Sequence, residues 1–333
     1  MDEIYVEYKL DLDKIQIFLE LIELVKQFAG LDNAQLESIF ERVAAIEQAG
    51  VGQEVVEVPT EPPTANDASG ESITIEAAIV TVDVQETTVQ STNVSTGVSS
   101  PSLHSSTGSL STNGHLESTL LSLLAKAKSS NANLPVLSGT LVLYLCGRFE
   151  YYVRTLFEEL AMQVATRCGS YERLPREMKK ELINTTAEVI SNPRKYGHAD
   201  NGVITFVENL NKNLKNNDVS EINFQCLSIT HENMKSDILD KLFARVGLKQ
   251  LWENLSAQNE LRIHFETSDA AQVKSRAQTM LDEIMTVRNN IAHPSNNTTF
   301  PDWRKVQEYL KFFQALASTI RDCAKVHVVS VNR

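Results

Sequence analysis

A long helical pattern ends at the stretch Arg288-Asn289-Asn290-Ile291-Ala292-His293-Pro294. The upstream positions that recur at steps of three and four are all apolar: Val273, Ala277, Leu281 and Ile284. This spacing places them on one face of a helix, and it predicts that this face packs against a core. Arg288 continues the same stripe, and a guanidinium in line with a buried face is costly unless an anionic group meets it. We therefore expect the end of this helix to combine core packing with a charged site.

The proline of this stretch determines where the helix ends. Pro294 cannot continue the helix and biases His293 toward an extended conformation, so the imidazole is expected beyond the last turn. At about 100° of rotation per residue, Arg288 and His293 point about 140° apart, whereas Asn289 and His293 differ by about 40°. One helix cannot easily direct both charged groups at one atom. Either the chain bends at residues 292–293, or two copies of the motif face each other across a dimer.

Helical patterns dominate residues 132–333, which we predict to form a single all-α bundle. The predicted helices cover about 138–165, about 180–190, a stretch after Thr230, the motif helix capped by Ser268 or Asp269, and about 302–324. The polar stretch 191–221 is rich in Asn, Lys and Gly, so turns and at most one short helix are expected there.

Residues 1–50 are predicted to form an acidic helical hairpin. One apolar stripe comprises Ile15, Phe18, Leu19, Ile22 and Val25, and the other comprises Leu36, Ile39, Phe40 and Val43. Gly30 and Gly50 are expected to end the two helices. A hairpin of this size cannot bury both stripes by itself, so it is expected to dock on the main domain or on another chain.

Residues 51–131 differ in composition from the rest of the chain. Ser, Thr, Val, Gly and Pro predominate, and the density of large apolar residues is too low to offset the entropy of ordering. We therefore predict a flexible linker, with one weak strand at 73–84 where apolar residues alternate imperfectly with Thr and Asp.

The bulk composition indicates a globular protein without a membrane span. Hydrophobic residues make up 42% of the chain, and no apolar run approaches the roughly 18 residues that a membrane-spanning helix needs. The first residues, Met1-Asp2-Glu3, lack the basic start of a signal peptide, so a cytoplasmic location is expected. The 4 cysteines are far apart with no Cys-x-x-Cys pair. We therefore expect buried free thiols rather than a zinc site or a disulfide framework.

Charge is distributed unevenly along the chain. Residues 1–119 carry 4 Lys+Arg against 20 Asp+Glu, a net charge of −16, and residues 120–333 carry 27 against 23, a net charge of +4, which together give the overall −12. The acidic part would repel nucleic acid, whereas the mildly basic part tolerates a phosphate backbone. This asymmetry permits nucleic-acid binding by the C-terminal region without requiring it.

An arginine and a histidine together can cleave RNA without a metal or a thiol. Histidine exchanges protons near neutral pH, and the planar guanidinium of arginine matches phosphate oxygens. RNA carries its own nucleophile, the 2′-hydroxyl. In this interpretation His293 accepts the 2′-hydroxyl proton, Arg288 stabilises charge on the phosphoryl oxygens, and Asn289 orients the imidazole or the phosphate. DNA, which lacks the hydroxyl, is expected to be inert.

The spacing alone is a weak signal, because the chain contains a second match. Arg321 and His327 have five residues between them, one more than Arg288 and His293, but no amide follows the arginine and no helix breaker follows the histidine. A purely structural interpretation of the motif keeps Arg288 in an ion pair between subunits and His293 as a C-terminal helix cap favoured by the helix dipole. The lone histidines His231 and His264 are interpreted as capping or surface residues.

The motif Arg288-Asn289-x-x-x-His293 resembles the signature of HEPN domains, a superfamily of helical nucleotide-binding and ribonuclease proteins. The stretch Leu145-Cys146-Gly147-Arg148-Phe149-Glu150-Tyr151-Tyr152 is also similar to the first helix of its RiboL-PSP and MAE-type branches. The resemblance covers residues 134 to 327 and leaves the acidic N-terminal part unexplained. It implies an all-α, HEPN-like helical bundle.

The resemblance also implies a function. Members are metal-independent endoribonucleases that act as homodimers with a composite cleft, often as toxins or antiviral defence effectors, and the catalytic roles would fall on Arg288, Asn289 and His293 with no cofactor. Glu150 is a candidate to support Arg288, and the insertion 195–221 is a candidate to gate the substrate. The acidic N-terminal segment is a candidate site for a regulatory or antitoxin protein. The alternative is a non-catalytic HEPN-like module that dimerises or binds a nucleotide or partner protein.

Overall fold

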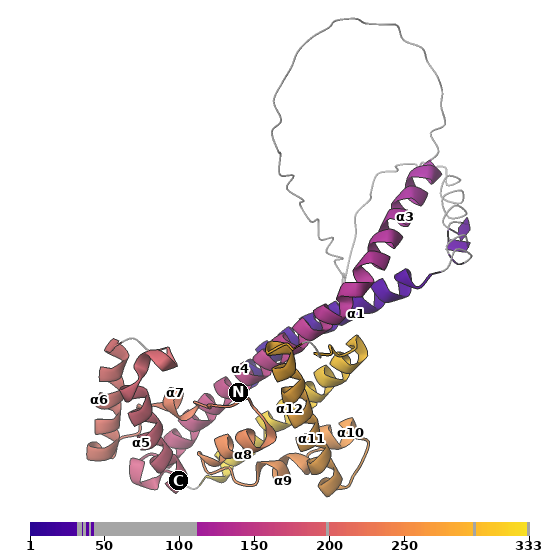
Figure 1. Ribbon diagram of the computed structural model, residues 1–333. Coiled ribbons are helices and arrows are strands. Elements are labelled where there is room, and N and C mark those ends of the chain that lie inside the picture. Colours follow the sequence, from indigo (N-terminus) through magenta and orange to yellow (C-terminus); the bar gives the residue numbers. More distant parts are fainter. Residues whose placement is uncertain are drawn as a thin grey trace, which may run out of the picture. The chain divides into compact units, whose positions relative to one another are not determined.

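The computed structural model describes residues 1–31, 35, 38–39, 41–42, 112–197, 200–295 and 298–331. The α-helices named below are α1 (Asp2–Ala29), α3 (Thr112–Ser130), α4 (Leu134–Cys168), α5 (Arg176–Ser191), α6 (Asp200–Asn216), α7 (Phe224–Leu227), α8 (Ser236–Ala244), α9 (Leu251–Ser256), α10 (Asn259–His264), α11 (Ala270–Ala292) and α12 (Trp303–Ser330). Short 3-10 turns are η1 (Asn131–Asn133), η2 (Tyr171–Arg173) and η3 (Pro193–Tyr196). No strand occurs in these described ranges, so the predicted all-α class is confirmed (Figure 1).

Two compact units divide the chain. One comprises residues 1–31 and 122–333, and the other comprises residues 32–121. The first unit holds the core and every site discussed below. The predicted second helix of the N-terminal hairpin falls mostly outside the described residues, and the predicted strand at 73–84 lies wholly outside them.

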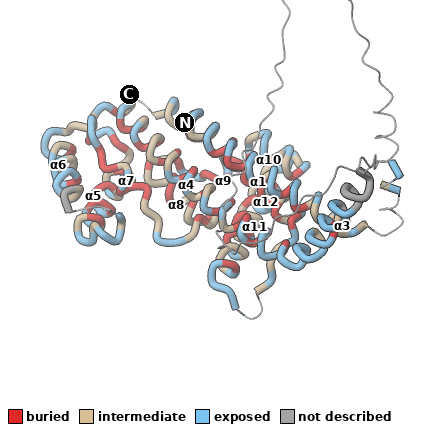
Figure 2. The backbone as a smooth tube through the Cα atoms, turned by 90° about the horizontal axis from the view of Figure 1, so that it is seen from above, coloured by how far each residue is buried: buried red, intermediate tan, exposed pale blue. Residues whose placement is uncertain are grey.

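Helix α4 is the central element of the first unit. It begins with a proline in its first turn and ends at Gly169, whose φ of 70° is a left-handed conformation suited to glycine. Buried residues run along its length and along α12 (Figure 2). Between these two helices, the rings of Phe149 and Phe313 stack with centroids 4.4 Å apart, and the Tyr152 hydroxyl donates a hydrogen bond of 2.8 Å to the Ala317 carbonyl. The predicted C-terminal helix is therefore confirmed and continues past residue 324 to Ser330.

Helix α1 packs on α4 and α12, which is one of the two docking possibilities expected from its sequence. Tyr8 stacks on Tyr152 with centroids 4.5 Å apart, and Arg148 pairs with Asp11. The apolar side chains that α1 buries are Tyr8, Leu12, Ile15, Leu19 and Ile22. The prediction was wrong for Phe18, whose side chain is 51% exposed. Helix α1 therefore shares one hydrophobic core with α4 and α12.

Lysine pairs fasten both ends of α1 to α12. Lys26 donates a hydrogen bond of 2.8 Å to Asp302, the residue that caps the start of α12. Lys325, near the other end of α12, donates to Asp2 at 2.6 Å. The two helices are therefore antiparallel.

Two further helices differ from the sequence-based predictions. Residues 112–130, within the stretch expected to be linker, form α3, where leucine, alanine and lysine after residue 119 favour a helix. The polar stretch 191–221 contains α6, a helix of 17 residues rather than a short one. Its Asn213 is buried because the side-chain amide donates to the carbonyls of Asp218 and Glu221, at 2.7 and 2.8 Å.

The motif helix α11 follows the prediction closely. Asp269 caps it by accepting hydrogen bonds from two backbone amides, and Val273, Ala277, Leu281 and Ile284 are all buried. The helix predicted after Thr230 is instead divided into α8, α9 and α10. Gly247, with a φ of +87°, interrupts it after α8.

The prediction of buried free thiols is confirmed. All 4 cysteines are free and buried. Among the described residues, no helix is long and apolar enough to cross a membrane.

Candidate functional site

The C-terminal end of α11 carries the three motif residues predicted to be catalytic, with His293 as the C-cap. Arg288 and Asn289 are partly buried, and the Arg288 guanidinium donates a hydrogen bond of 3.3 Å from Nη1 to Asn289 Oδ1. His293 is exposed and caps the helix with a φ of −123°, and its backbone amide donates to the Asn289 carbonyl at 3.0 Å. The imidazole therefore lies beyond the last turn, as Pro294 predicts.

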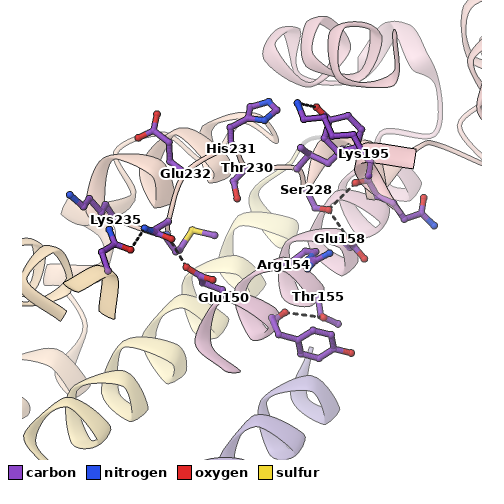
Figure 3. Close-up of a pocket in the computed structure, with 17 residues that line it drawn as sticks. Glu150, Arg154, Thr155, Glu158, Lys195, Ser228, Thr230, His231, Glu232 and Lys235 are labelled. Carbon is purple, nitrogen blue, oxygen red and sulfur yellow. Dashed lines mark hydrogen bonds between the residues drawn. The ribbon is translucent and has the colours of Figure 1, made fainter. Parts of the chain in front are cut away.

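A wide groove of about 1110 Å³ opens beside this turn. Glu150, Arg154 and Glu158 of α4 form one wall, and the loop 228–235 between α7 and α8 forms the opposite wall (Figure 3). The turn η3 contributes Lys195, so the insertion predicted to gate the site does border it. Asn289 is the motif residue that lines this groove.

Hydrogen bonds from both sides hold the loop 228–235 in place. Ser228 donates to Glu158 at 2.6 Å, and the Met234 amide donates to Glu150 at 3.4 Å. Asn233 donates its side-chain amide to Asn289 Oδ1 at 2.5 Å (Figure 3). The motif and the loop are therefore joined directly.

His293 faces a different hollow. A smaller depression of about 260 Å³ is lined by His293, Val287, Asn290 and residues of the following loop. His293 is not one of the described residues that line the large groove. One chain therefore brings Arg288 and Asn289 together and directs His293 elsewhere. This agrees with the wide angle expected between Arg288 and His293, whereas the small angle expected between Asn289 and His293 does not apply because His293 lies beyond the helix.

Glu150 lies near Arg288 without an ion pair between the two described side chains. Both act on the buried Cys146 thiol, whose pKa rises to about 12, chiefly through burial and further through Glu150, with Arg288 opposing the rise. The carboxylate instead holds the Met234 amide. Glu150 thus supports the loop that contacts Asn289, rather than the guanidinium itself.

The sequence-based interpretation missed His231, which lines the same groove as Asn289. Its Nε2 lies 3.4 Å from Glu188 Oε1, and the Tyr196 hydroxyl donates a hydrogen bond to the same carboxylate oxygen. Lys195 Nζ in turn donates to the Tyr196 hydroxyl at 2.9 Å. These contacts, led by the Tyr196 hydrogen bond, lower the pKa of Glu188. No spacing pattern links residues 188, 196 and 231, so only the fold reveals the cluster.

The other lone histidine has a packing role. His264 lies against the rings of Phe265 and Phe312, with centroid distances of 4.7 and 5.7 Å, and burial lowers its pKa. A half-buried imidazole with this environment is kept neutral. His264 therefore belongs to the core edge rather than to a site.

The second arginine–histidine pair has a structural role. The Arg321 guanidinium lies over the Tyr5 ring, 4.3 Å from its centroid, and lies 3.8 Å from Asp2. His327 Nε2 is 3.0 Å from the Val246 carbonyl oxygen. These residues fasten α1 and the segment after α8 to α12, which confirms that the match in spacing was fortuitous.

Comparison with known proteins gives one result for this fold. The model of the RiboL-PSP-HEPN family matches residues 113–326, which include the groove, the motif helix and most of α12. No curated protein and no solved structure matches the chain. The match covers more than half of the sequence, and it begins after α1. The chain belongs to the RiboL-PSP-HEPN family.

Proposed function

We propose that this protein is a metal-independent endoribonuclease that cleaves RNA by attack of the 2′-hydroxyl on the adjacent phosphorus. The observation that carries this proposal is the pairing of Arg288 with Asn289 beside an open groove, with the exposed imidazole of His293 one turn further along. The HEPN family is associated with ribonuclease and nucleotide-binding functions in general.

Each motif residue has a defined part in the reaction. His293 accepts the 2′-hydroxyl proton, the 2′-oxygen bonds to phosphorus, and the bond from phosphorus to the 5′-oxygen breaks. Arg288 stabilises the charge that builds on the non-bridging oxygens, and Asn289 orients the phosphate. The products are a 2′,3′-cyclic phosphate and a 5′-hydroxyl. None of these roles requires a metal ion.

In this proposal a homodimer brings His293 close to Arg288 and Asn289. Since His293 and Asn289 line different hollows of one chain, the proposed cleft combines the motifs of two copies. In this arrangement the imidazole of one protomer approaches the guanidinium and amide of its partner. Growth arrest by RNA cleavage, as a toxin or an antiviral defence effector, is the biological role that we propose.

The acidic N-terminal segment is the proposed site of control. Residues 1–119 carry a net charge of −16, which would repel RNA or bind a basic regulatory or antitoxin protein. Deleting residues 32–111, which leaves α1 in the chain, should raise activity if this segment masks the groove. Unchanged cleavage and unchanged toxicity would contradict the masking role.

The test of the ribonuclease proposal compares wild type with His293→Ala and Arg288→Lys on total RNA in EDTA. We expect wild type to produce 2′,3′-cyclic phosphate ends and to leave DNA of the same sequence intact, and we expect a loss of about 10²-fold or more in His293→Ala. Arg304→Lys is the matched control, because Arg304 is an exposed arginine stacked on Trp303. Identical RNA patterns for wild type and His293→Ala would favour a non-catalytic binding module.

A further inference from the structure

A connected polar cluster occupies the wall of the groove opposite α4. Its members come from three segments: Glu188 from α5, Lys195 and Tyr196 from η3, and His231 from the loop before α8. Building a hydrogen-bonded network from three separate segments orders side chains that would otherwise rotate freely in solvent. In Figure 3, His231 lies across the groove from Arg154 and Glu158.

Glu188 holds His231 in a defined orientation. The contact of 3.4 Å uses Nε2, which leaves Nδ1 available to a molecule in the groove. The imidazole side chain is 52% exposed, so it exchanges protons with solvent. The charged and titratable groups around it are the Glu188 carboxylate, the Tyr196 phenol, the Lys195 ammonium and the neighbouring Glu232. The closest of these is the Glu188 carboxylate, 3.4 Å from Nε2.

The loop also places His231 near the motif. Asn233, which bonds to Asn289, is two residues away, and two residues span at most about 7 Å. Arg154 and Lys235 line the same groove, and no ion pair joins either one to another described residue. Two cations beside an imidazole are suited to successive phosphates of one strand.

From this arrangement we propose that His231 is a second proton-transferring residue of the groove and the general acid of the cleavage reaction. The proposal rests on the ribonuclease function proposed above. As His293 accepts the 2′-hydroxyl proton and the 2′-oxygen bonds to phosphorus, His231 donates its proton to the departing 5′-oxygen. The electron pair of the breaking bond remains on that oxygen, which leaves as a neutral hydroxyl. Solvent then returns a proton to His231 and removes one from His293.

The decisive experiment uses two substrates that differ in one atom. The first is an RNA oligonucleotide that wild type cleaves, and the second carries sulfur in place of the 5′-bridging oxygen at that position, because a thiolate leaves without protonation. We expect His231→Ala to cleave the oxygen substrate about 10²-fold more slowly and to cleave the sulfur substrate at close to the wild-type rate. His293→Ala should be slow on both substrates.

Two further variants separate proton donation from structural support. Glu188→Gln keeps the size of the side chain but removes the charge that contacts His231 Nε2, so it should slow cleavage of the oxygen substrate more than cleavage of the sulfur substrate. Glu172→Gln is the matched control, because Glu172 is an exposed glutamate that does not line the groove. Its rates on both substrates and its pH profile should follow those of wild type.

Three outcomes would overturn the proposal. Equal rates of wild type and His231→Ala on the oxygen substrate would remove His231 from the reaction while leaving the ribonuclease function in place. Equal losses on both substrates, with an unchanged thermal transition, would make the histidine a structural residue. If wild type leaves both RNAs intact, the ribonuclease proposal and the role of His231 fail together.

Discussion

The side-chain amide of Asn233 donates a hydrogen bond to Asn289, although the two residues are 56 positions apart in the sequence. Asn289 also accepts a hydrogen bond from Arg288, so one amide oxygen joins the motif to the wall of the groove. Fixing this oxygen limits the rotation of the Asn289 side chain, and its NH₂ group is thereby directed away from both donors. The loop before α8 therefore helps to fix the position of the Asn289 side chain.

The first prediction concerns this hydrogen bond. Asn233→Ala should slow RNA cleavage by roughly fivefold, because a single hydrogen bond contributes about 1 kcal/mol. Initial rates on a labelled oligonucleotide provide the measurement. Gln225→Ala is the control, since Gln225 is an exposed amide at the same groove. A rate for Asn233→Ala equal to that of Gln225→Ala would show that the motif does not depend on the loop.

The second prediction compares two glycines of α4. A Cβ on Gly139 would lie 2.9 Å from Phe300 Cε1 and 3.5 Å from Ile291 Cγ2, whereas a Cβ on Gly147 would meet nothing within 4 Å. Gly139→Ala should therefore destabilise the fold by about 1–3 kcal/mol through overpacking. Gly147→Ala should stabilise it by about 0.5–1 kcal/mol, because alanine loses less backbone entropy in a helix. Urea unfolding of both variants tests the pair, and shifts of the same sign would contradict the packing described around Ile291.

The third prediction concerns the acid response of α1. Hydrogen bonds from Lys325 and Lys26 lower the pKa values of Asp2 and Asp302 below their usual value of 3.8. A carboxyl group whose pKa is lower in the folded state stabilises that state above its unfolded pKa, and the stabilisation disappears as the pH falls through the folded pKa. Between pH 5 and pH 2, wild type should therefore lose more stability than the variant Asp2→Asn/Asp302→Asn.

Urea midpoints across this pH range provide the measurement. Asparagine at position 302 keeps the helix cap, so the comparison isolates the charge. Parallel curves for wild type and the double variant would show that the lysine pairs contribute nothing to acid sensitivity.

The fourth prediction concerns thiol reactivity. Burial raises the pKa of Cys146 to about 12 and the pKa values of Cys226 and Cys323 to about 11. Because the thiolate is the reactive form, a thiol reagent at pH 7 should modify the native protein slowly. All 4 cysteines should react once guanidinium unfolds the chain. Rapid modification of even one thiol in the native protein would contradict its buried position.

Periodicity and capping residues were sufficient to predict much of the fold. Asp269 and Pro294 marked the two ends of α11, and the steps of three and four along α11 and α12 identified the faces that are buried. These signals are local, so they do not depend on knowing which helices are neighbours. The position of His293 beyond the last turn follows from the same reasoning.

Helix α1 shows where periodicity fails. It carries apolar side chains on more than one face, including Leu10 and Ile17, which are 56% and 57% exposed. Spacing alone cannot decide which stripe faces the core, so Phe18 was assigned to the wrong side. The choice is made by contacts with α4 and α12, such as the stacking of Tyr8 on Tyr152.

The polar cluster beside the groove could not be predicted from the sequence for a related reason. His231 has no distinctive neighbours in the sequence, and its contacts come from residues 188 and 196. Long-range polar contacts of this kind leave no period in a sequence, so the candidate site was only half predicted.

The fortuitous pair Arg321 and His327 has a consequence for classifying similar sequences. A pattern search that accepts either four or five residues between an arginine and a histidine would count this chain twice. In the first match, Arg321 stacks on the Tyr5 ring and lies near Asp2. In the second, Arg288 donates a hydrogen bond to Asn289, which lines the open groove. Requiring an amide directly after the arginine and a proline directly after the histidine would reject the first match and retain the second.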